Sequence, residues 1–222
     1  MYITTYNPEG RTENHDISAL PDSCPVCHAS VTVDPKIAFF NPYSSTNRVQ
    51  VVFWCPNNKC RAAFVGIYSG YSGTLYLESL LPIEPQTYEF TRIISELSPD
   101  FVELYDQAYA AEQVKLSDIC GCGYRKALEF LVKDYVLSVT SEDEEKEKIK
   151  AESLAHIISK RVQNSNIKEV AKRATWLGND ETHYVRKWTS KELKDLKELI
   201  NLVVNWIEME IRTKQLQVDM PE

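Results

Sequence analysis

The stretch Cys24-Pro25-Val26-Cys27 brings two cysteines close together in a turn, because proline fixes the backbone where the turn begins. A second pair lies in Cys55-Pro56-Asn57-Asn58-Lys59-Cys60, a looser turn of similar composition. Two close pairs of cysteines separated by strand-forming sequence are typical of a tetrahedral zinc site, in which four thiolates bind one ion. The first third of the chain is therefore predicted to fold around a metal ion.

The predicted metal ligands are Cys24, Cys27, Cys55 and Cys60. Because four thiolates complete the coordination shell, we expect a structural zinc ion (Zn) and no position left open for catalysis. The alternative is a pair of disulfides, which a reducing compartment disfavours. His28 follows Cys27 and is interpreted as a loop residue, since the four cysteines already fill the shell.

Strand-forming sequence surrounds both pairs of cysteines. The segments rich in β-branched and aromatic residues are 31–33, 37–40, 49–54, 62–68 and 74–81. Short strands around paired cysteines predict a zinc ribbon. Aromatic residues of this region could stack on a base or anchor a protein partner, although some of them are needed for the small core. They include Tyr43, Trp54, Tyr68, Tyr71 and Tyr76.

Composition predicts two modest globular parts. A chain of 222 residues that is 43% hydrophobic can bury one substantial core and one small core stabilised by metal. The predicted connecting segment begins with the prolines at positions 82 and 85 and continues up to Ser98. Residues 1–94 are therefore predicted to form the zinc-ribbon domain with flanking strands, and residues 95–222 a helical domain. The expected fold class is α+β, a small N-terminal β zinc ribbon followed by a C-terminal α-helical bundle.

The net charge of −7 is unevenly distributed. Residues 1–94 carry six basic and eight acidic residues, a balance of −2, and the remainder carries −5. Such an acidic chain is a poor non-specific binder of nucleic acid, so any such binding has to be local. Residues 160–197 offer a place for it, with ten Lys or Arg against five Asp or Glu. Without a recognisable secretory leader or an apolar run of about 20 residues, the chain is expected to be cytoplasmic and to have no membrane partner.

Helical periodicity and helix-start signals dominate the second half of the sequence. Ser98-Pro99-Asp100 has an N-cap serine, a proline at the first helical position and an acid in the first turn. Two pairs have the spacing of a capping box, Ser141 with Glu144 and Thr189 with Glu192. These starts, and apolar residues at helical spacing between them, predict a bundle of five mostly antiparallel helices.

A polar segment, residues 177–184, interrupts the apolar pattern after the fourth predicted helix, which spans about 167–176. Gly178 either ends that helix or allows a close approach of two backbones. Asn179 and His183 would lie on one face if the segment is helical, because they are four residues apart. Since the segment belongs to the locally basic region, phosphate would be attracted to it.

Three segments of the helical half occur in the order Ser98-Pro99-Asp100-Phe101-Val102-Glu103-Leu104-Tyr105, Gly123-Tyr124-Arg125-Lys126-Ala127-Leu128-Glu129 and Leu177-Gly178-Asn179-x-x-x-His183. They resemble a bacterial helical family of unknown function that is often encoded near restriction and phage-defence genes. That family resembles the HEPN superfamily of helical bundles, many of which are ribonucleases. The resemblance covers residues 98–212, about half of the chain, and implies a HEPN-like bundle.

The resemblance implies a metal-independent endoribonuclease that acts as a homodimer or higher homo-oligomer, with an Arg-x-x-x-x-His motif from each subunit facing the other. His183 matches the histidine, which would act as general base on the ribose 2′-hydroxyl or as general acid on the leaving oxygen. RNA suits this chemistry because DNA lacks the 2′-hydroxyl. Asn179 matches the polar residue after the arginine, whereas Gly178 stands at the arginine position itself.

A guanidinium from elsewhere in the chain could replace the missing arginine. Arg125, with Glu129 one turn later, could orient the histidine and contact phosphate, or the two could form an ordinary intrahelical ion pair. Arg173 and Arg186 flank the motif and are more readily explained as surface charge. For His183 the alternative is a structural hydrogen bond to a buried carbonyl. The candidate catalytic residues are His183, Asn179, Arg125 and Glu129.

Two cysteines lie outside the predicted zinc site. Cys120 and Cys122 alternate with glycines, a pattern that close packing explains better than metal binding or a reactive thiolate. The sequence has no glycine-rich phosphate loop, nucleophilic-serine elbow or paired catalytic carboxylates at recognisable spacing. ATPases and hydrolases of those kinds are therefore not expected.

Two functions of different classes agree with these observations. The first is an endoribonuclease effector, expected in anti-phage defence, in which the zinc ribbon senses a protein trigger or RNA and the helical dimer cleaves RNA. The second is a non-catalytic adaptor that binds protein or nucleic acid with the same two domains. The retained His183 and the local positive charge favour the first, and Gly178 favours the second.

Overall fold

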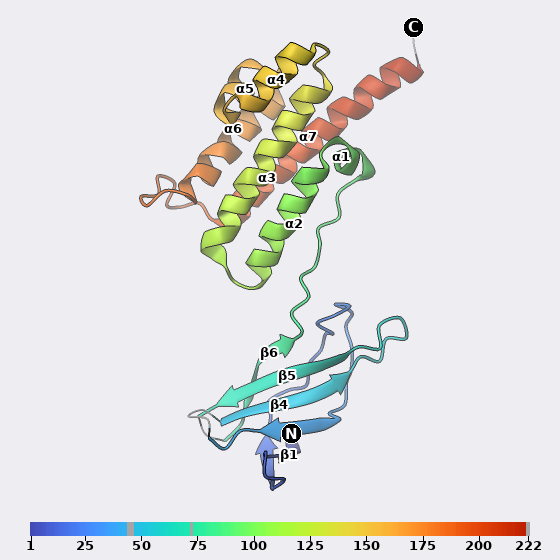
Figure 1. Ribbon diagram of the computed structural model, residues 1–222, viewed down its shortest axis with the longest axis vertical. Coiled ribbons are helices and arrows are strands. Elements are labelled where there is room, and N and C mark those ends of the chain that lie inside the picture. The colour runs from blue at the N-terminus through green and yellow to red at the C-terminus, as the bar shows by residue number, and fades with distance from the viewer. Residues whose placement is uncertain (44–46, 72, 221–222) are drawn as a thin grey trace. The chain divides into compact units, whose positions relative to one another are not determined.

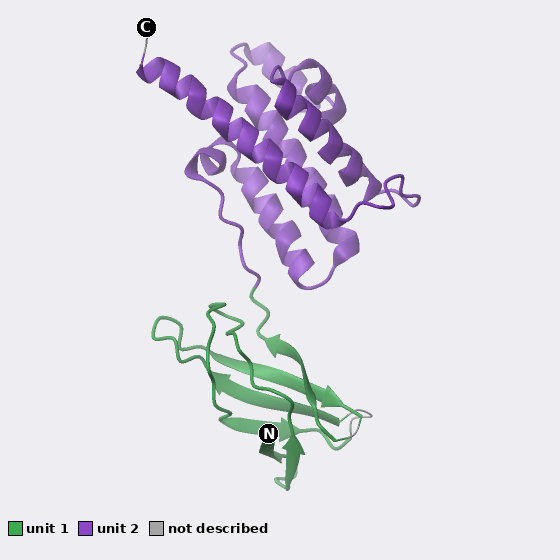
Figure 2. Ribbon diagram, turned by 180° about the vertical axis from the view of Figure 1, so that it is seen from behind, with its two compact units in different colours: residues 1–84 green, residues 85–222 purple. Residues whose placement is uncertain are grey.

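The computed structural model describes residues 1–43, 47–71 and 73–220. The chain separates into two compact units, Met1–Glu84 and Pro85–Glu222 (Figure 2). The division falls inside the predicted connecting segment but ten residues before the predicted domain limit at residue 94, because Phe90 and Ile94 pack in the helical core. The predicted α+β fold class is confirmed, with strands in the first unit and helices in the second (Figure 1).

The described residues of the first unit form one six-stranded sheet. Its strands are β1 (Tyr2–Tyr6), β2 (Thr12–Asp16), β3 (Ile37–Phe40), β4 (Asn47–Trp54), β5 (Ala63–Gly70) and β6 (Tyr76–Leu81). They lie in the order β2-β1-β3-β4-β5-β6, and neighbouring strands are antiparallel except β1 and β3. The sequence did not specify the positions of β1 and β2. The predicted strand at 31–33 is wrong, because this segment is irregular and buries Val33 in the core.

One face of this sheet covers the core of the first unit. In β4, Val49, Val51 and Phe53 are completely buried, while the residues between them point to the other face. Phe53 stacks on Phe64 of β5, with ring centroids 5.4 Å apart. Of the aromatic residues considered for recognition, Tyr68 belongs to the core, and the exposed ones are Tyr43, Trp54, Tyr71 and Tyr76. The two cysteine pairs lie in the connections from β2 to β3 and from β4 to β5.

The second unit contains seven helices within the part of the chain that the structure describes. They are α1 (Arg92–Leu97), α2 (Pro99–Gln113), α3 (Ser117–Ser138), α4 (Asp143–Ala151), α5 (Leu154–Lys160), α6 (Ser165–Asp180) and α7 (Leu193–Asp219). The central helix is α3, which packs against all the others, and the last turns of α7 extend past the bundle (Figure 1). None of these helices, over the described ranges, is both long and apolar enough to cross a membrane.

The structure has two more helices than the sequence predicts. The short helix α1 lies in the predicted connecting segment, and its buried Ile94 anchors it to the bundle. The third predicted helix is divided into α4 and α5 at Glu152 and Ser153. Ser153 causes the division, because its side chain accepts a hydrogen bond from the backbone N–H of His156 and so caps a new helix.

Of the three predicted helix starts, the one at Ser98 is right, and those at Ser141 and Thr189 are wrong. Ser98 and Pro99 are the N-cap and first residue of α2, although the Ser98 hydroxyl bonds to Asp134 and not to the helix backbone. The box at 141 and 144 does not form, because α4 begins at Asp143 after an uncapped Glu142. At α7 the capping box is shifted: Glu192 is the N-cap and Asp195 its partner, so the helix begins at Leu193.

The fourth predicted helix, now α6, is longer than expected and ends at Asp180. Leu177 and Gly178 continue it because both are buried in the bundle, where α6 packs against α3. Gly178 therefore allows a close approach and does not end the helix. Asn179 lies in the last turn of α6, whereas His183 follows the helix. The condition for a shared helical face, a helix that continues to His183, is therefore not met.

Candidate functional site

The four predicted metal ligands converge on one point of the first unit. The sulfur atoms of Cys24, Cys27, Cys55 and Cys60 all lie within 4.8 Å of one another. Cys24 Sγ is 4.0 Å from Cys60 Sγ, and Cys27 Sγ is 3.7 Å from Cys55 Sγ. Four thiolates around a zinc ion would lie about 3.8 Å apart, given a Zn–S bond of about 2.3 Å and tetrahedral angles. The cysteines are free thiols, so the disulfide alternative does not describe this structure.

The backbone of both turns is arranged in the same way around the cluster. The residue after the second cysteine of each pair has a positive φ angle, 57° at His28 and 53° at Arg61. His28 is exposed and lies in the loop, as predicted. In the second turn, the backbone N–H groups of Cys60 and Arg61 both donate to the carbonyl oxygen of Asn57. The side-chain amide of Asn57 also lies 3.7 Å from Cys27 Sγ, so it can stabilise a thiolate there.

The surroundings shift the pKa values of two of these thiols in opposite directions. The backbone N–H of Ala29 bonds to the sulfur of Cys27 and lowers its pKa to about 7. Burial raises the pKa of Cys55 to about 12, because a buried thiolate without a cation loses its hydration. A bound cation removes this penalty, since it replaces the protons of all four thiols. The cluster therefore has the distances and donors of a tetrahedral metal site, which are compatible with zinc.

The remaining cysteines, Cys120 and Cys122, do not belong to a cluster of metal-binding side chains within the described residues. Cys120 is completely buried, and its thiol lies 3.3 Å from the carbonyl oxygen of Ser117. Cys122 is exposed. The glycines that alternate with them are sites of close packing, because a Cβ atom at Gly121 or at Gly123 would lie under 3.0 Å from a neighbouring side chain. The geometry agrees with the packing explanation.

The second candidate site is a polar cluster where α3 crosses α6. Arg125, on α3, donates from Nε to Asn179 Oδ1 at 3.1 Å. Its Nη1 donates to Glu129 Oε2 at 3.2 Å, and the other carboxylate oxygen of Glu129 lies 2.9 Å from Lys133 Nζ. Burial opposes ionisation of Glu129, but the bonds from Lys133 and Arg125 outweigh it and lower its pKa. Glu129 is therefore a fixed anion that orients the guanidinium.

Gly178 explains how Arg125 reaches this position. A Cβ atom at Gly178 would lie 2.6 Å from Cδ and 2.9 Å from Cβ of Arg125. These distances are shorter than van der Waals contact, so a side chain at position 178 and an arginine at 125 exclude each other in this packing. The Arg125 side chain thus lies over Gly178.

The other candidate arginines do not contact this cluster. Arg173 pairs with Glu169 at 2.6 Å on the exposed side of α6. Arg186 pairs with Glu181 at 2.6 Å and donates to the carbonyl oxygen of Lys191. Among the three arginines considered, and within the described parts of the chain, only Arg125 bonds to Asn179.

His183 lies in the turn after α6 and is exposed to solvent. Its backbone N–H donates to the carbonyl oxygen of Asp180 at 3.4 Å. Asp180, to which no sequence motif assigned a role, is buried and holds the following loop in place. Asp180 Oδ2 accepts hydrogen bonds from the backbone N–H groups of Lys187 at 2.9 Å and Trp188 at 2.5 Å. An aspartate at a helix end before a polar segment is a weak signal, because only the return of the chain supplies its partners.

Replacing Gly178 with alanine is expected to lower the free energy of unfolding by about 1–3 kcal/mol. Alanine in an exposed helix would be favoured over glycine by about 1 kcal/mol. Here the overlap outweighs this gain, because the Arg125 Cβ atom is fixed to the α3 backbone and cannot turn away. Denaturant unfolding followed by circular dichroism measures the change. Asn166→Ala, at an exposed position of the same helix, is the control and should change stability by less than about 0.5 kcal/mol. A Gly178→Ala protein as stable as the parent would contradict the close contact.

Comparison with protein families matches residues 106–219 to DUF4145, a domain of unknown function. The match covers half of the chain, and the chain belongs to this family. The predicted membership of a family of unknown function is thereby confirmed. Arg125, Gly178, Asn179 and His183 all lie inside the matched region, and the cysteine cluster lies outside it. Neither a search of curated proteins nor one of solved structures found a match.

Proposed function

We propose that the protein is a metal-independent endoribonuclease of HEPN type and that Arg125 supplies the guanidinium missing from its motif. The bond from Arg125 to Asn179, over Gly178, is the observation that carries the proposal. This bond brings the Arg125 guanidinium to the side-chain amide of Asn179, which follows the position where the HEPN motif has its arginine. Glu129, which also pairs with Lys133, holds that cation in a partly buried place, where its interaction with phosphate is stronger than in water.

In the proposed reaction, the ribose 2′-hydroxyl attacks the adjacent phosphorus atom and the 5′-oxygen of the next nucleotide leaves. The imidazole of His183 removes the proton of the attacking hydroxyl, and the histidine of the second subunit protonates the leaving oxygen. Arg125 stabilises the negative charge that builds on the phosphate. The products are a 2′,3′-cyclic phosphate and a 5′-hydroxyl. Asp180 positions the loop that contains His183 and takes no part in proton transfer.

The homodimer in this proposal follows from the resemblance to HEPN proteins, in which two copies of the motif face each other. His183 is exposed, so a second subunit could approach it without unfolding either chain. The role in anti-phage defence follows from the genes near which the resembling family is encoded.

The first unit is proposed to be a zinc ribbon that recognises the trigger of the nuclease. Four cysteines at zinc-compatible distances support the metal. When zinc is bound, it would fold the two cysteine turns and take no part in catalysis, because the four thiolates leave no position for substrate. The trigger is an RNA or a protein.

Purified protein is expected to cleave single-stranded RNA without added divalent cation and to leave DNA of the same sequence intact. The product should end in a 2′,3′-cyclic phosphate, and Mg²⁺ should not raise the rate. Arg125→Ala should lower the rate about 100-fold, because a preorganised charge at the phosphate is lost. Arg92→Ala is the matched control, since Arg92 also pairs with a glutamate four residues later but is far more exposed. Equal rates for Arg125→Ala and the parent, or equal cleavage of DNA, would refute the proposal.

A non-catalytic adaptor is the second candidate, and the outer face of the sheet favours it. Tyr6 and Phe39 are neighbours across β1 and β3, and both are 43% exposed. Trp54 at the end of β4 is 54% exposed. Aromatic side chains on an open sheet face are suited to a protein or nucleic-acid partner. Absence of cleavage together with retained partner binding by the first unit would select this function.

A further inference from the structure

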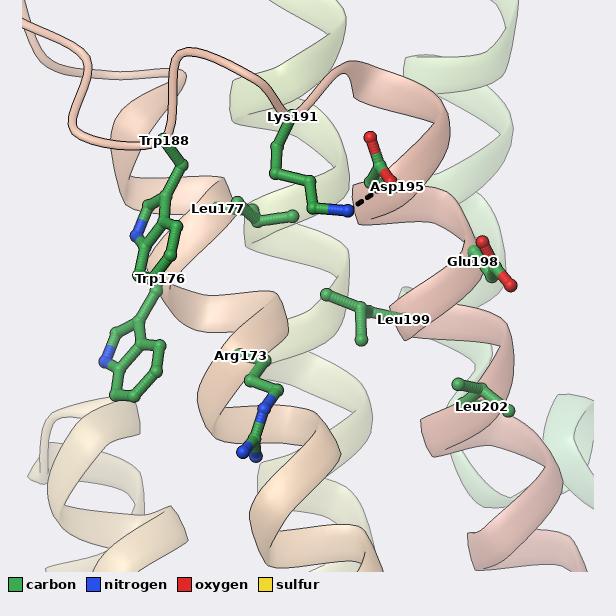
Figure 3. A pocket seen from close by; sticks show the side chains of 9 residues that line it. All are labelled: Arg173, Trp176, Leu177, Trp188, Lys191, Asp195, Glu198, Leu199 and Leu202. Carbon is green, nitrogen blue, oxygen red and sulfur yellow. Dashed lines mark hydrogen bonds and ion pairs between the residues drawn. The ribbon is translucent and has the colours of Figure 1, made fainter.

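Two tryptophans form an exposed, parallel pair beside the polar cluster. Trp176 lies on α6 and Trp188 on the loop that Asp180 holds, and their rings are tilted by only 10° with centroids 6.1 Å apart. Figure 3 shows them next to each other at one side of the groove between α6 and α7. Their exposed fractions, 41% and 38%, are high for tryptophan, so flat aromatic surface is left in contact with water.

Three lysines surround this pair without carboxylate partners. In the described ranges, no ion pair is formed by Lys168, Lys172 or Lys187. Lys172 Nζ lies 5.3 Å from the centroid of the Trp176 ring. Lysines without partners attract an anion more strongly than paired lysines, because no nearby carboxylate offsets their field.

The groove between α6 and α7, next to the tryptophans, differs because its basic residues are paired with acids. It has a volume of about 420 Å³ and lies between α6 and α7 (Figure 3). Its basic residues are neutralised: Lys191 pairs with Asp195 at 3.0 Å, and Arg173 pairs with Glu169. Attraction for an anion is therefore concentrated on the other side of Trp176, where the three free lysines lie.

Two hollows on that side meet at Trp176 and Asn179. One, of about 370 Å³, is lined by Lys168, Lys172 and Glu169, whose carboxylate pairs with Arg173. The other, of about 230 Å³, is lined by Lys187, Trp188 and Asp180, whose carboxylate accepts two backbone N–H groups. Asn179 uses its carbonyl oxygen to accept from Arg125, so its Nδ2 group remains as a donor. The hollows therefore contain ammonium groups, an amide donor and an aromatic face, and they lead to the candidate catalytic cluster.

We infer that this surface binds single-stranded RNA. A base stacks on the exposed indoles of Trp176 and Trp188, and the flanking phosphates lie against the three lysines and Asn179 Nδ2. An unpaired base is required because a base inside a duplex cannot offer its face to an indole. The acidic side chains of a peptide would satisfy the lysines but have no aromatic face to stack on the tryptophans. The inference rests on the proposed function and names the substrate class of the same site, although binding can be measured without cleavage.

The test measures binding by the zinc-loaded full chain in the His183→Ala background, so that the RNA stays intact. The probes are a fluorescent single-stranded RNA, a hairpin duplex of the same composition and a mononucleotide. Single-stranded RNA should bind most tightly. Trp176→Ala should weaken its binding about 10-fold, as expected for one lost stacked base, and Trp176→Phe should restore most of the loss because it keeps an aromatic face.

The lysines are tested through the salt dependence of binding. Removing Lys168, Lys172 and Lys187 together by alanine substitution should make the slope of log Kobs against log salt less steep by about 2. The matched control removes the same charge from α4 by replacing Lys146, Lys148 and Lys150, all of which are paired with acids. Its slope should match that of the parent.

The inference is overturned if both triple variants lose the same affinity, if Trp176→Ala binds like the parent, or if the duplex or the mononucleotide binds as tightly as the single strand. Failure of the proposed function has a different signature. RNA binding that depends on Trp176 and the lysines, without cleavage by the wild-type chain, would leave the inference standing and remove the nuclease. Cleavage that is unaffected by Trp176→Ala would leave the nuclease proposal standing and remove the binding inference.

Discussion

Replacing Cys55 with serine is expected to reduce bound zinc from one ion per chain to none and to unfold the first unit. Cys55 is buried, and its sulfur is central to a cluster in which all four sulfurs lie within 4.8 Å. Metal binding contributes about 10–16 kcal/mol to the folding of zinc-finger peptides, more than the whole stability of a small domain. The loss of one ligand also leaves a buried hydroxyl and three thiols that no cation holds together.

Metal analysis and two-dimensional NMR of the full chain measure this effect. The signals of residues 1–84 should collapse, whereas those of the helical unit should keep their positions, because the two units have separate cores. Cys122→Ser is the control: this cysteine is exposed and lies outside the cluster, so zinc content and spectrum should not change. A folded first unit that retains zinc after Cys55→Ser would show that the cluster is not the metal site.

Under the nuclease proposal, replacing His183 with alanine is expected to lower the rate of RNA cleavage by about 100- to 10,000-fold, the usual contribution of a general acid or base. The melting temperature should stay the same. His183 is exposed in the turn after α6, and its side chain makes no hydrogen bond within the described residues. A large loss of rate without a loss of stability would thus show that the imidazole takes part in the reaction and not in folding.

The rate is measured on single-stranded RNA together with thermal unfolding of the same preparation. His156→Ala provides the control, because His156 is also exposed and lies on α5 near Glu152. It should cleave at the parent rate. If the His183→Ala protein cleaves RNA as fast as the parent, the imidazole has no part in the reaction and the nuclease proposal fails.

Arg125 and Gly178 are best understood as one feature of the packing. An arginine at position 178 would need the space that the Arg125 side chain fills, since even a Cβ atom there overlaps it. Glycine at position 178 and arginine at position 125 are therefore coupled by the distance between α3 and α6. Under the nuclease proposal, Arg125 on α3 brings its guanidinium to Asn179, the residue next to the position where the HEPN motif has its arginine.

Local sequence predicted the parts of the fold that depend on nearby residues. The strands at 37–40 and 49–54 are found as β3 and β4, because alternation of buried and exposed side chains is a property of a short segment. The errors occurred where packing or a cap overrides periodicity. Ser153 starts a new helix inside a continuous pattern, and Leu177 keeps α6 helical beyond its predicted end.

The sequence by itself determined the cysteine cluster and the existence of a helical half, because short spacing in the chain dictates turns and amphipathic faces. Only the tertiary structure decided that Arg125 contacts Asn179, that Trp176 stacks on Trp188 and that Tyr6 lies beside Phe39. In the first of these pairs the partners are 54 residues apart, and the second depends on a loop held by a buried aspartate. Contacts of this kind depend on how whole elements pack, and no local pattern encodes them.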